Sequence, residues 1–330
     1  MRTALCSLLT VILSLAACQA APTAHVALAD TEARWHNGPV PLAGVVVHPA
    51  SPAAARRLPG AVIIQGSGPS DRSNKWARAI AEELARTGMV VLLPDKRGSG
   101  QSGGDWRTAT FDDLAQDALA GLEHLATRGD VDPRRIGVIG LSQGGFVAPL
   151  AAVRSSRVAF VVAISAAATP LVEQVEHEMR NTFRQAGLAP PDVEQAMKIQ
   201  HAAGRYLTHG DWESYAALLR DAKTRPWAGV AAGFPPDRES WVWAWWRPLL
   251  AFDPMDSWKA VRVPALLVYG ADDEHDNVPV RRSVERLRSA PAVAVAVIPG
   301  TGHSLYAAGT SELHPEFKRE LRRWVRRHVH

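Results

Sequence analysis

A serine set between glycines, in the segment G-L-S-Q-G at residues 140–144, is the strongest candidate nucleophile in this chain. It follows an apolar run at residues 136–139 and precedes a run of small apolar residues that starts at Phe146. A G-x-S-x-G turn between a strand and a helix lifts the serine hydroxyl above the sheet edge, and its glycines let neighbouring backbones approach closely. This context predicts acyl transfer to Ser142.

A second segment, G-Q-S-G-G at residues 100–104, matches the same pattern around Ser102. The apolar run that precedes it, residues 89–93, ends well before the serine, and no helical periodicity follows. We therefore interpret this segment as a glycine-rich loop and keep Ser142 as the candidate nucleophile.

A nucleophilic serine needs a base, and His303 is the best candidate. Of the 12 histidines, it alone follows an apolar strand-like run, lies downstream of Ser142 and adjoins a glycine. An imidazole titrates near neutral pH, so it can accept the serine proton and return it to the leaving group.

Three aspartates after the apolar run at residues 265–269 could orient that imidazole. The common G-x-x-D spacing, counted from Gly270, favours Asp273. The loop that leads to Val278 is longer than usual, so Asp276 and Asp272 remain alternatives.

A glycine-rich turn around Ser67 follows the strand-like run at residues 61–64. In an open α/β sheet, ligands bind beyond the carboxyl ends of the strands. We expect the amides of Ser67 and Gln143 to hold an oxyanion and Gly66 to lie beside the substrate. An ordinary loop is the alternative interpretation.

Strand-like runs alternate with helical periodicity up to residue 164 and again from residue 265. This alternation predicts an α/β fold with a mostly parallel sheet covered by helices on both faces. Thr110 and Asp113 have the spacing of a capping box at the start of one helix. The segment between the two regions is helical only, which predicts a cap inserted after the sixth strand. The predicted boundaries are 36–169 and 259–330 for the core and 170–258 for the cap.

The predicted cap contains a tryptophan cluster, Trp241, Trp243, Trp245 and Trp246. We expect Trp241 and Trp245 to line an apolar substrate pocket. The same side chains could instead fix the cap to the core.

The order Ser142, Asp273, His303, each after a strand, resembles the α/β-hydrolase superfamily from about residue 40 onward. Three segments look like its bacterial serine-aminopeptidase-like and acyl-esterase branch: Q-G-S-G-P-S-D-R at 65–72, D-K-R-G-S-G-Q-S at 95–102 and G-L-S-Q-G-G at 140–145. The resemblance implies an eight-stranded, mostly parallel sheet with a helical cap, and a structural role for the loop at 95–102.

The resemblance also implies that Ser142 is the nucleophile, that His303 is the base and that the amides of Ser67 and Gln143 are the oxyanion donors. One departure is Gln65, which stands where the family usually has histidine. Backbone donors need no particular side chain, so we expect the oxyanion site to be kept.

The N-terminus has the pattern of an export signal: Arg2, then an apolar stretch at residues 5–15, too short for a stable membrane span. The segment L-A-A-C that ends at Cys18 resembles a bacterial lipobox. We expect a signal peptide over residues 1–18, lipidation of Cys18, a tether at 19–35 and attachment to the cell envelope. Cleavage after Ala20, which would give a soluble exported protein, is the alternative.

The composition is that of a globular protein, with 47% hydrophobic and 21% charged residues among 330. The net charge of +4 is small and its arginines concentrate in the last helix, so we expect no nucleic-acid partner. No cluster has metal-ligand spacing, so we expect neither metal nor cofactor. Removal of Cys6 with the signal peptide would leave Cys18 alone, without an intramolecular disulfide.

These features favour a serine hydrolase of the carboxylesterase type, acting on a small acyl ester or a short peptide-like substrate. A serine aminopeptidase or a thioesterase on the same scaffold is the alternative. A non-catalytic, lipid-tethered binding protein is the alternative from another class.

Overall fold

The computed structural model describes residues 26–51, 57–229 and 233–330. The expected signal peptide and Cys18 lie outside these ranges. The predicted tether is wrong where it is described, because strand β1 (Leu28–Asn37) starts inside it. β1 pairs with its neighbour along its whole length, and only alternate side chains such as Ala33 and Trp35 are buried, so its sequence shows no continuous apolar run.

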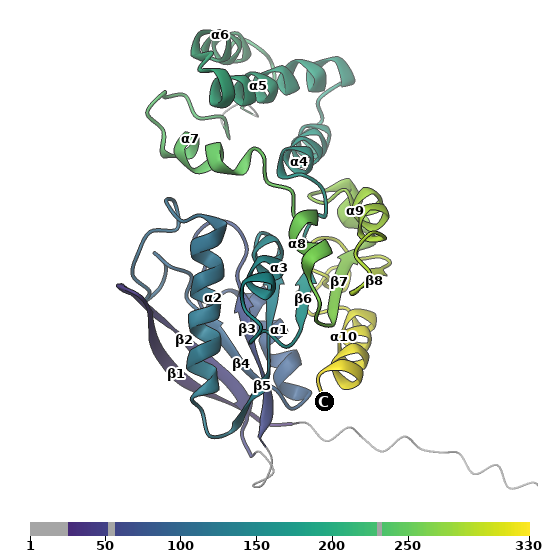
Figure 1. Ribbon diagram of the computed structural model, residues 1–330. Coiled ribbons are helices and arrows are strands. Elements are labelled where there is room, and N and C mark those ends of the chain that lie inside the picture. The colour runs from purple at the N-terminus through teal and green to yellow at the C-terminus, as the bar shows by residue number, and fades with distance from the viewer. Residues whose placement is uncertain (1–25, 52–56, 230–232) are drawn as a thin grey trace, which may run out of the picture.

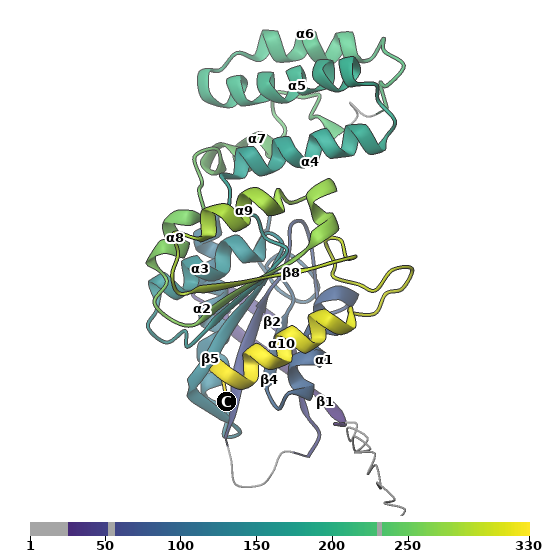
Figure 2. The ribbon, with the colours of Figure 1, turned by 90° about the vertical axis from the view of Figure 1, so that its right-hand side faces the viewer.

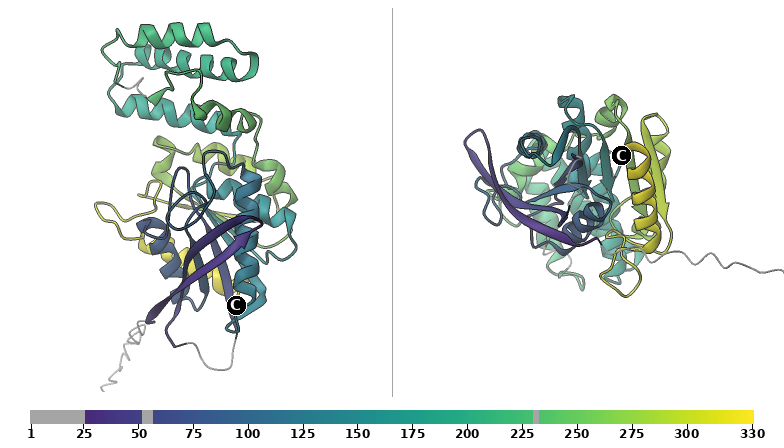
Figure 3. Two further views of the ribbon diagram at one scale, coloured as in Figure 1. Left: turned by 90° about the vertical axis from the view of Figure 1, so that its left-hand side faces the viewer. Right: turned by 90° about the horizontal axis from the view of Figure 1, so that it is seen from below.

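Eight strands form one sheet in the order β1-β2-β4-β3-β5-β6-β7-β8 (Figure 1). The other strands are β2 (Val40–Pro49), β3 (Leu58–Ile64), β4 (Val90–Pro94), β5 (Val131–Leu141), β6 (Val161–Ile164), β7 (Ala265–Gly270) and β8 (Val293–Ile298). β2 runs antiparallel to β1 and β4, and the six strands β3 to β8 run parallel to one another. The predicted mostly parallel, eight-stranded sheet is confirmed. The β1–β2 hairpin forms one edge (Figure 3).

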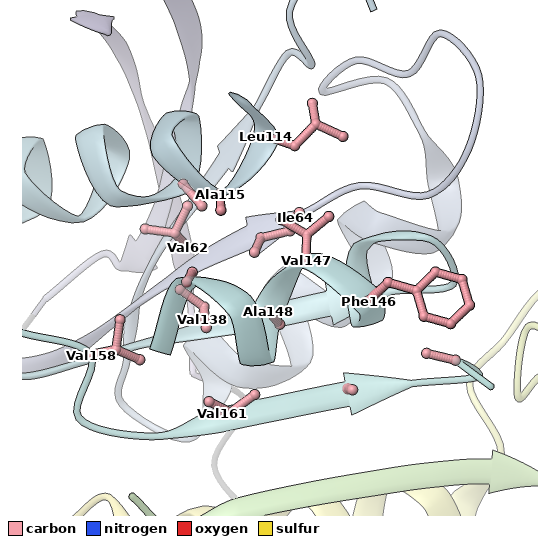
Figure 4. Packing of buried hydrophobic residues seen from close by; sticks show 14 of the residues in the cluster. Val62, Ile64, Leu114, Ala115, Val138, Phe146, Val147, Ala148, Val158 and Val161 are labelled. Atoms are coloured by element: carbon pink, nitrogen blue, oxygen red, sulfur yellow. The ribbon is translucent and has the colours of Figure 1, made fainter. Parts of the chain in front are cut away.

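Helices cover both faces of the sheet because successive residues of each central strand point to opposite sides. The helices are α1 (Lys75–Arg86), α2 (Phe111–Ala126), α3 (Gly144–Arg154), α4 (Leu171–Gln185), α5 (Pro190–His209), α6 (Trp212–Ala222), α7 (Trp241–Trp246), α8 (Met255–Ala260), α9 (Val280–Leu287) and α10 (Pro315–His328). Val62 and Ile64 of β3 pack with α2 and α3 (Figure 4), whereas Ala61 and Ile63 pack with α1 and α10.

The predicted capping box at the start of α2 is confirmed. The backbone amide of Asp113 donates to the Thr110 hydroxyl at 3.1 Å, and the Asp113 carboxylate accepts from the Thr110 amide at 2.9 Å. This helix therefore starts at a residue that its own sequence specifies.

Helices α4 to α7 lie between β6 and β7 in sequence and form a cap beyond the carboxyl edge of the sheet. α4 and α7 form the layer near the sheet, and α5 and α6 form the outer layer (Figure 2). The cap has its own apolar core, which includes Met197, Tyr215 and Trp243. The predicted cap extends to residue 258, but Met255 and Trp258 of α8 pack in the core that covers the sheet. No helix within the described ranges is long and apolar enough to cross a membrane.

The central strand β5 requires glycine at position 137. A Cβ placed there would lie 2.5 Å from the carbonyl oxygen of Phe160 and 2.5 Å from its ring. Neither group can retreat within a packed sheet. We predict that Gly137→Ala lowers the free energy of unfolding by about 2 kcal/mol or more, as measured by urea denaturation.

Gly129→Ala is the matched control, because a Cβ at Gly129 meets open space. It should change the free energy of unfolding by less than about 0.5 kcal/mol. Equal effects of the two substitutions would contradict the packing described here.

Candidate active site

Ser142 lies in the turn between β5 and α3, in a backbone conformation that few residues other than glycine adopt. Its φ is +50°. A Cβ on Gly144 would lie 2.0 Å from the carbonyl oxygen of Ile64, and one on Gly140 would lie 2.2 Å from that of Gly144. The two glycines thus allow the tight turn that presents Ser142 at the edge of the sheet.

His303 lies between Ser142 and an aspartate. Its Nε2 is 3.0 Å from Ser142 Oγ, and its Nδ1 is 2.8 Å from Asp273 Oδ2. An ionised carboxylate only accepts hydrogen bonds, so the proton belongs on Nδ1 and the serine hydroxyl donates to Nε2. This arrangement can take the proton from Ser142.

Of the three aspartates considered, the structure places Asp273 against His303. Asp273 is fully buried, and its Oδ1 accepts from the Asn277 amide at 3.2 Å. Asp272 is exposed. The carboxylate of Asp276 accepts from the Asn277 side chain at 3.3 Å.

The long acid loop is the docking site of the cap helix α4. Four side chains spaced along one face of α4 donate to backbone carbonyls of the loop, with bonds of 2.9 to 3.0 Å. The bonds run from Gln174 to Asn277, from His177 to Glu274, from Asn181 to Asp276 and from Gln185 to His275. The extra length of this loop therefore connects the cap to the segment that carries Asp273.

Ser67 and Gln143 line the same pocket as Ser142. Neither backbone amide donates to another group within the described part of the chain. Gln143 also precedes the first turn of α3, where the helix dipole favours negative charge. Gly66 lies beside them, since a Cβ there would be 3.5 Å from Ser142 Cβ. Two amides without an acceptor, on residues that line the pocket of Ser142, can bind a developing oxyanion.

The pocket has a volume of about 410 Å³, and both apolar and polar side chains form its walls. Its lining includes Phe111, Phe146, Leu171, Val175, Val278, Trp245 and Trp246. Such walls suit an apolar acyl group or leaving group.

The structure does not place Trp241, a predicted substrate contact, among the residues that line this pocket. This side chain is 44% exposed and packs edge-on against Trp106 of the core, with ring centroids 5.2 Å apart. It lies one helical turn before Trp245, which is enough to place it beyond the pocket. The cluster therefore divides: Trp245 lines the pocket, whereas Trp241 holds the cap to the core.

Sequence reasoning missed several residues around the imidazole. The Trp76 ring lies 5.6 Å from that of His303, between centroids. Ser165, which has φ of +54°, donates from Oγ to the His303 carbonyl at 2.6 Å. Ser165 directly follows β6, so its place at a strand end was a usable signal. Nothing in the sequence marked Trp76. Glu178 of α4 also lines the pocket, but the sequence alone does not show which of the cap's acidic side chains reaches the site.

Ser102 has a structural place. Its hydroxyl donates to the Asp95 carbonyl at 2.7 Å and accepts from the Ala43 amide at 2.9 Å. Burial favours a higher pKa for Asp95, but hydrogen bonds from Arg72 and the Gln101 amide lower it. The loop thus fixes an ionised Asp95 against Arg72.

Residues 58–314 match the sequence model of the alpha/beta hydrolase family. An esterase of Pyrococcus furiosus superposes with a TM-score of 0.59 at 18% identity over 92% of each chain. A proline iminopeptidase of Mycobacterium smegmatis superposes with a TM-score of 0.56 at 20% identity, over 91% of this chain and 99% of that one. These two likenesses show the fold alone.

Among curated proteins, dipeptidyl-peptidase 5 of Porphyromonas endodontalis is 29% identical over 106 residues. The match covers 31% of this chain and 15% of that protein. The chain thus spans a small part of that relative's length.

The geometry predicts which carboxylate holds the Nδ1 proton of His303. In proton NMR, an imidazole N–H bonded to a carboxylate resonates far downfield. We expect this signal in the wild-type protein, its loss in Asp273→Ala and its retention in Asp276→Ala. Loss in Asp276→Ala alone would contradict the assignment.

Proposed function

Because this chain belongs to the alpha/beta hydrolase family, we propose that it is a serine hydrolase that cleaves carboxylic esters through a covalent acyl-enzyme. The observation that carries the proposal is the hydrogen-bonded series Asp273–His303–Ser142. This series opens into a pocket of about 410 Å³ whose walls combine apolar side chains such as Phe146 and Trp245 with polar ones. A base-activated hydroxyl beside a pocket with large apolar side chains is suited to an acyl ester.

In the proposed reaction, Ser142 Oγ attacks the ester carbonyl carbon while His303 Nε2 takes the hydroxyl proton. Asp273 stabilises the resulting imidazolium, and the Ser67 and Gln143 amides stabilise the oxyanion. The C–O bond to the alcohol then breaks, and the leaving oxygen receives the proton from His303. Water then attacks the acyl carbon while His303 takes its proton. The bond to Ser142 Oγ breaks, Oγ receives the proton back from His303, and the carboxylic acid is released. A thioester would react by the same sequence.

The test of this proposal is hydrolysis of p-nitrophenyl butyrate. We expect the wild-type protein to hydrolyse it and Ser142→Ala to lose at least about 10³-fold in kcat, because no other group supplies the nucleophile. Ser102→Ala, compared per folded molecule, should retain the rate. A folded wild-type protein that hydrolyses no ester, or an active Ser142→Ala, would favour a binding protein on this scaffold.

A second candidate, removal of an amino-terminal residue from a peptide, is favoured by Glu178. This residue lines the pocket with Ser142 and His303. Its carboxylate accepts from Gln174 at 3.0 Å, and no lysine or arginine within the described ranges pairs with it. Burial raises its pKa, against the opposing effects of Gln174 and His303. A substrate ammonium would supply the missing charge partner.

Two substrates separate these functions. The esterase proposal expects hydrolysis of nitrophenyl acyl esters but not of amino-acid arylamides, and the reverse result would favour the aminopeptidase. In that case Glu178→Gln should lower kcat/KM for alanine p-nitroanilide by at least about 10-fold, since it removes a charge-assisted hydrogen bond. Glu176→Gln, on the same helix but outside this pocket, is the control and should have no such effect.

A further inference from the structure

Lys96 is a buried lysine at the carboxyl end of β4, and it is 8% exposed. Its ammonium donates to the Gly66 carbonyl at 2.8 Å, to the Gly68 carbonyl at 3.1 Å and to Gln143 Oε1 at 2.8 Å. An ammonium has three donors, so all three are used. Every acceptor belongs to one of the two segments that carry the candidate oxyanion amides.

The bond to Gly66 acts on the same peptide group that carries the Ser67 amide. In a planar trans peptide, the carbonyl and the N–H point in opposite directions. A positive charge at the carbonyl oxygen therefore polarises the group so that its N–H end becomes a stronger donor. The bond to Gly68 fixes the chain on the other side of Ser67.

The bond to Gln143 connects the second amide to the first. β3 lies between β4 and β5 in the sheet, so Lys96 reaches from the end of β4 across β3 to the turn after β5. One side chain thus holds the turns after β3 and β5 at a fixed separation. Both amides must point at one oxygen atom for an oxyanion site to work, so this separation matters.

The charge of Lys96 is not neutralised by a neighbouring carboxylate. Asp95 pairs with Arg72 at 2.8 Å, and Asp117 of α2 pairs with Arg97 at 2.6 Å. Within the described ranges, Lys96 bonds only to neutral oxygens. It therefore places an unpaired positive charge behind the site where negative charge would develop.

We propose that Lys96 is a positioning residue that holds the Ser67 and Gln143 amides in register and polarises the first of them toward the oxyanion. This role rests on the ester-cleaving function proposed above. The segment D-K-R-G-S-G-Q-S at residues 95–102, which contains Lys96, would thus support the reaction as well as the structure of the loop.

Burial lowers the pKa of Lys96 from 10.5 to about 8. A neutral amine has two N–H donors, so it cannot serve three acceptors, and its charge is lost. The oxyanion site should therefore weaken as the pH rises through about 8.

The contribution of Lys96 to stability changes in the opposite direction. The unfolded chain, with the higher pKa, binds more protons than the folded chain between pH of about 8 and 10.5, so this contribution rises with pH in that window. A loss of activity near pH 8 that came from Lys96 would thus not reflect unfolding.

The test is Lys96→Met, a neutral side chain of similar length, with Lys198→Met on the exposed face of α5 as the control. With p-nitrophenyl butyrate at pH 7, we expect kcat of Lys96→Met to fall roughly 10- to 100-fold with little change in KM, since the loss affects the transition state. The wild-type and Lys198→Met proteins should lose kcat above a pH of about 8, and Lys96→Met should lack this step.

A second measurement needs neither a variant nor turnover. In amide NMR spectra of the wild-type protein, the Ser67 and Gln143 resonances should shift with pH around a midpoint near 8. Amides that do not titrate, or Lys96→Met with the wild-type kcat, would overturn the proposal. Titrating amides in a folded protein that cleaves no ester would instead contradict the proposed function and leave the role of Lys96 in the loop standing.

Discussion

The 2.8 Å hydrogen bond between His303 and Asp273 joins two loops. These loops can approach each other this closely because glycines stand where their backbones meet. A Cβ on Gly270 would lie 2.3 Å from the Gly302 carbonyl oxygen. The same constraint operates at the serine, where Gly144 packs against the end of β3. Parallel strands bring these loops to one edge of the sheet, and the glycines let them touch. These contacts bring the serine, the histidine and the aspartate to one edge of the sheet.

The cap is tied to the site rather than simply resting above it. Its helix α4 satisfies carbonyl groups of the acid loop and also supplies pocket residues such as Val175 and Glu178. Asn181 is buried at this junction and bonds to the carbonyls of both Glu274 and Asp276. A movement of α4 away from the core would leave buried polar groups without partners, which is costly. The cap thus takes part in fixing the triad acid as well as in enclosing the substrate.

All strands except β1, the elbow at Ser142 and the position of His303 could be predicted, because local patterns specify them: apolar runs, glycine spacing and strand ends. The G-x-x-D spacing favoured Asp273 as the acid but left Asp276 and Asp272 open, because the fold of this loop depends on α4 side chains about 90 residues earlier in the chain. β1 was missed because its sequence shows alternation without an apolar run. The contacts of Lys96 were equally hidden, since its Gln143 partner lies 47 residues away. The sequence thus predicts helices and strands, but it does not predict which side chains far apart in the chain will contact each other.

If Ser142 is an activated nucleophile, a fluorophosphonate should label its hydroxyl covalently. The folded protein would be treated with a fluorophosphonate, digested and analysed by mass spectrometry. We expect a single phosphonyl adduct per chain, carried by the peptide that contains Ser142 and absent when the protein is first denatured. An adduct on Ser102 or another serine, or no adduct on the folded protein, would contradict it.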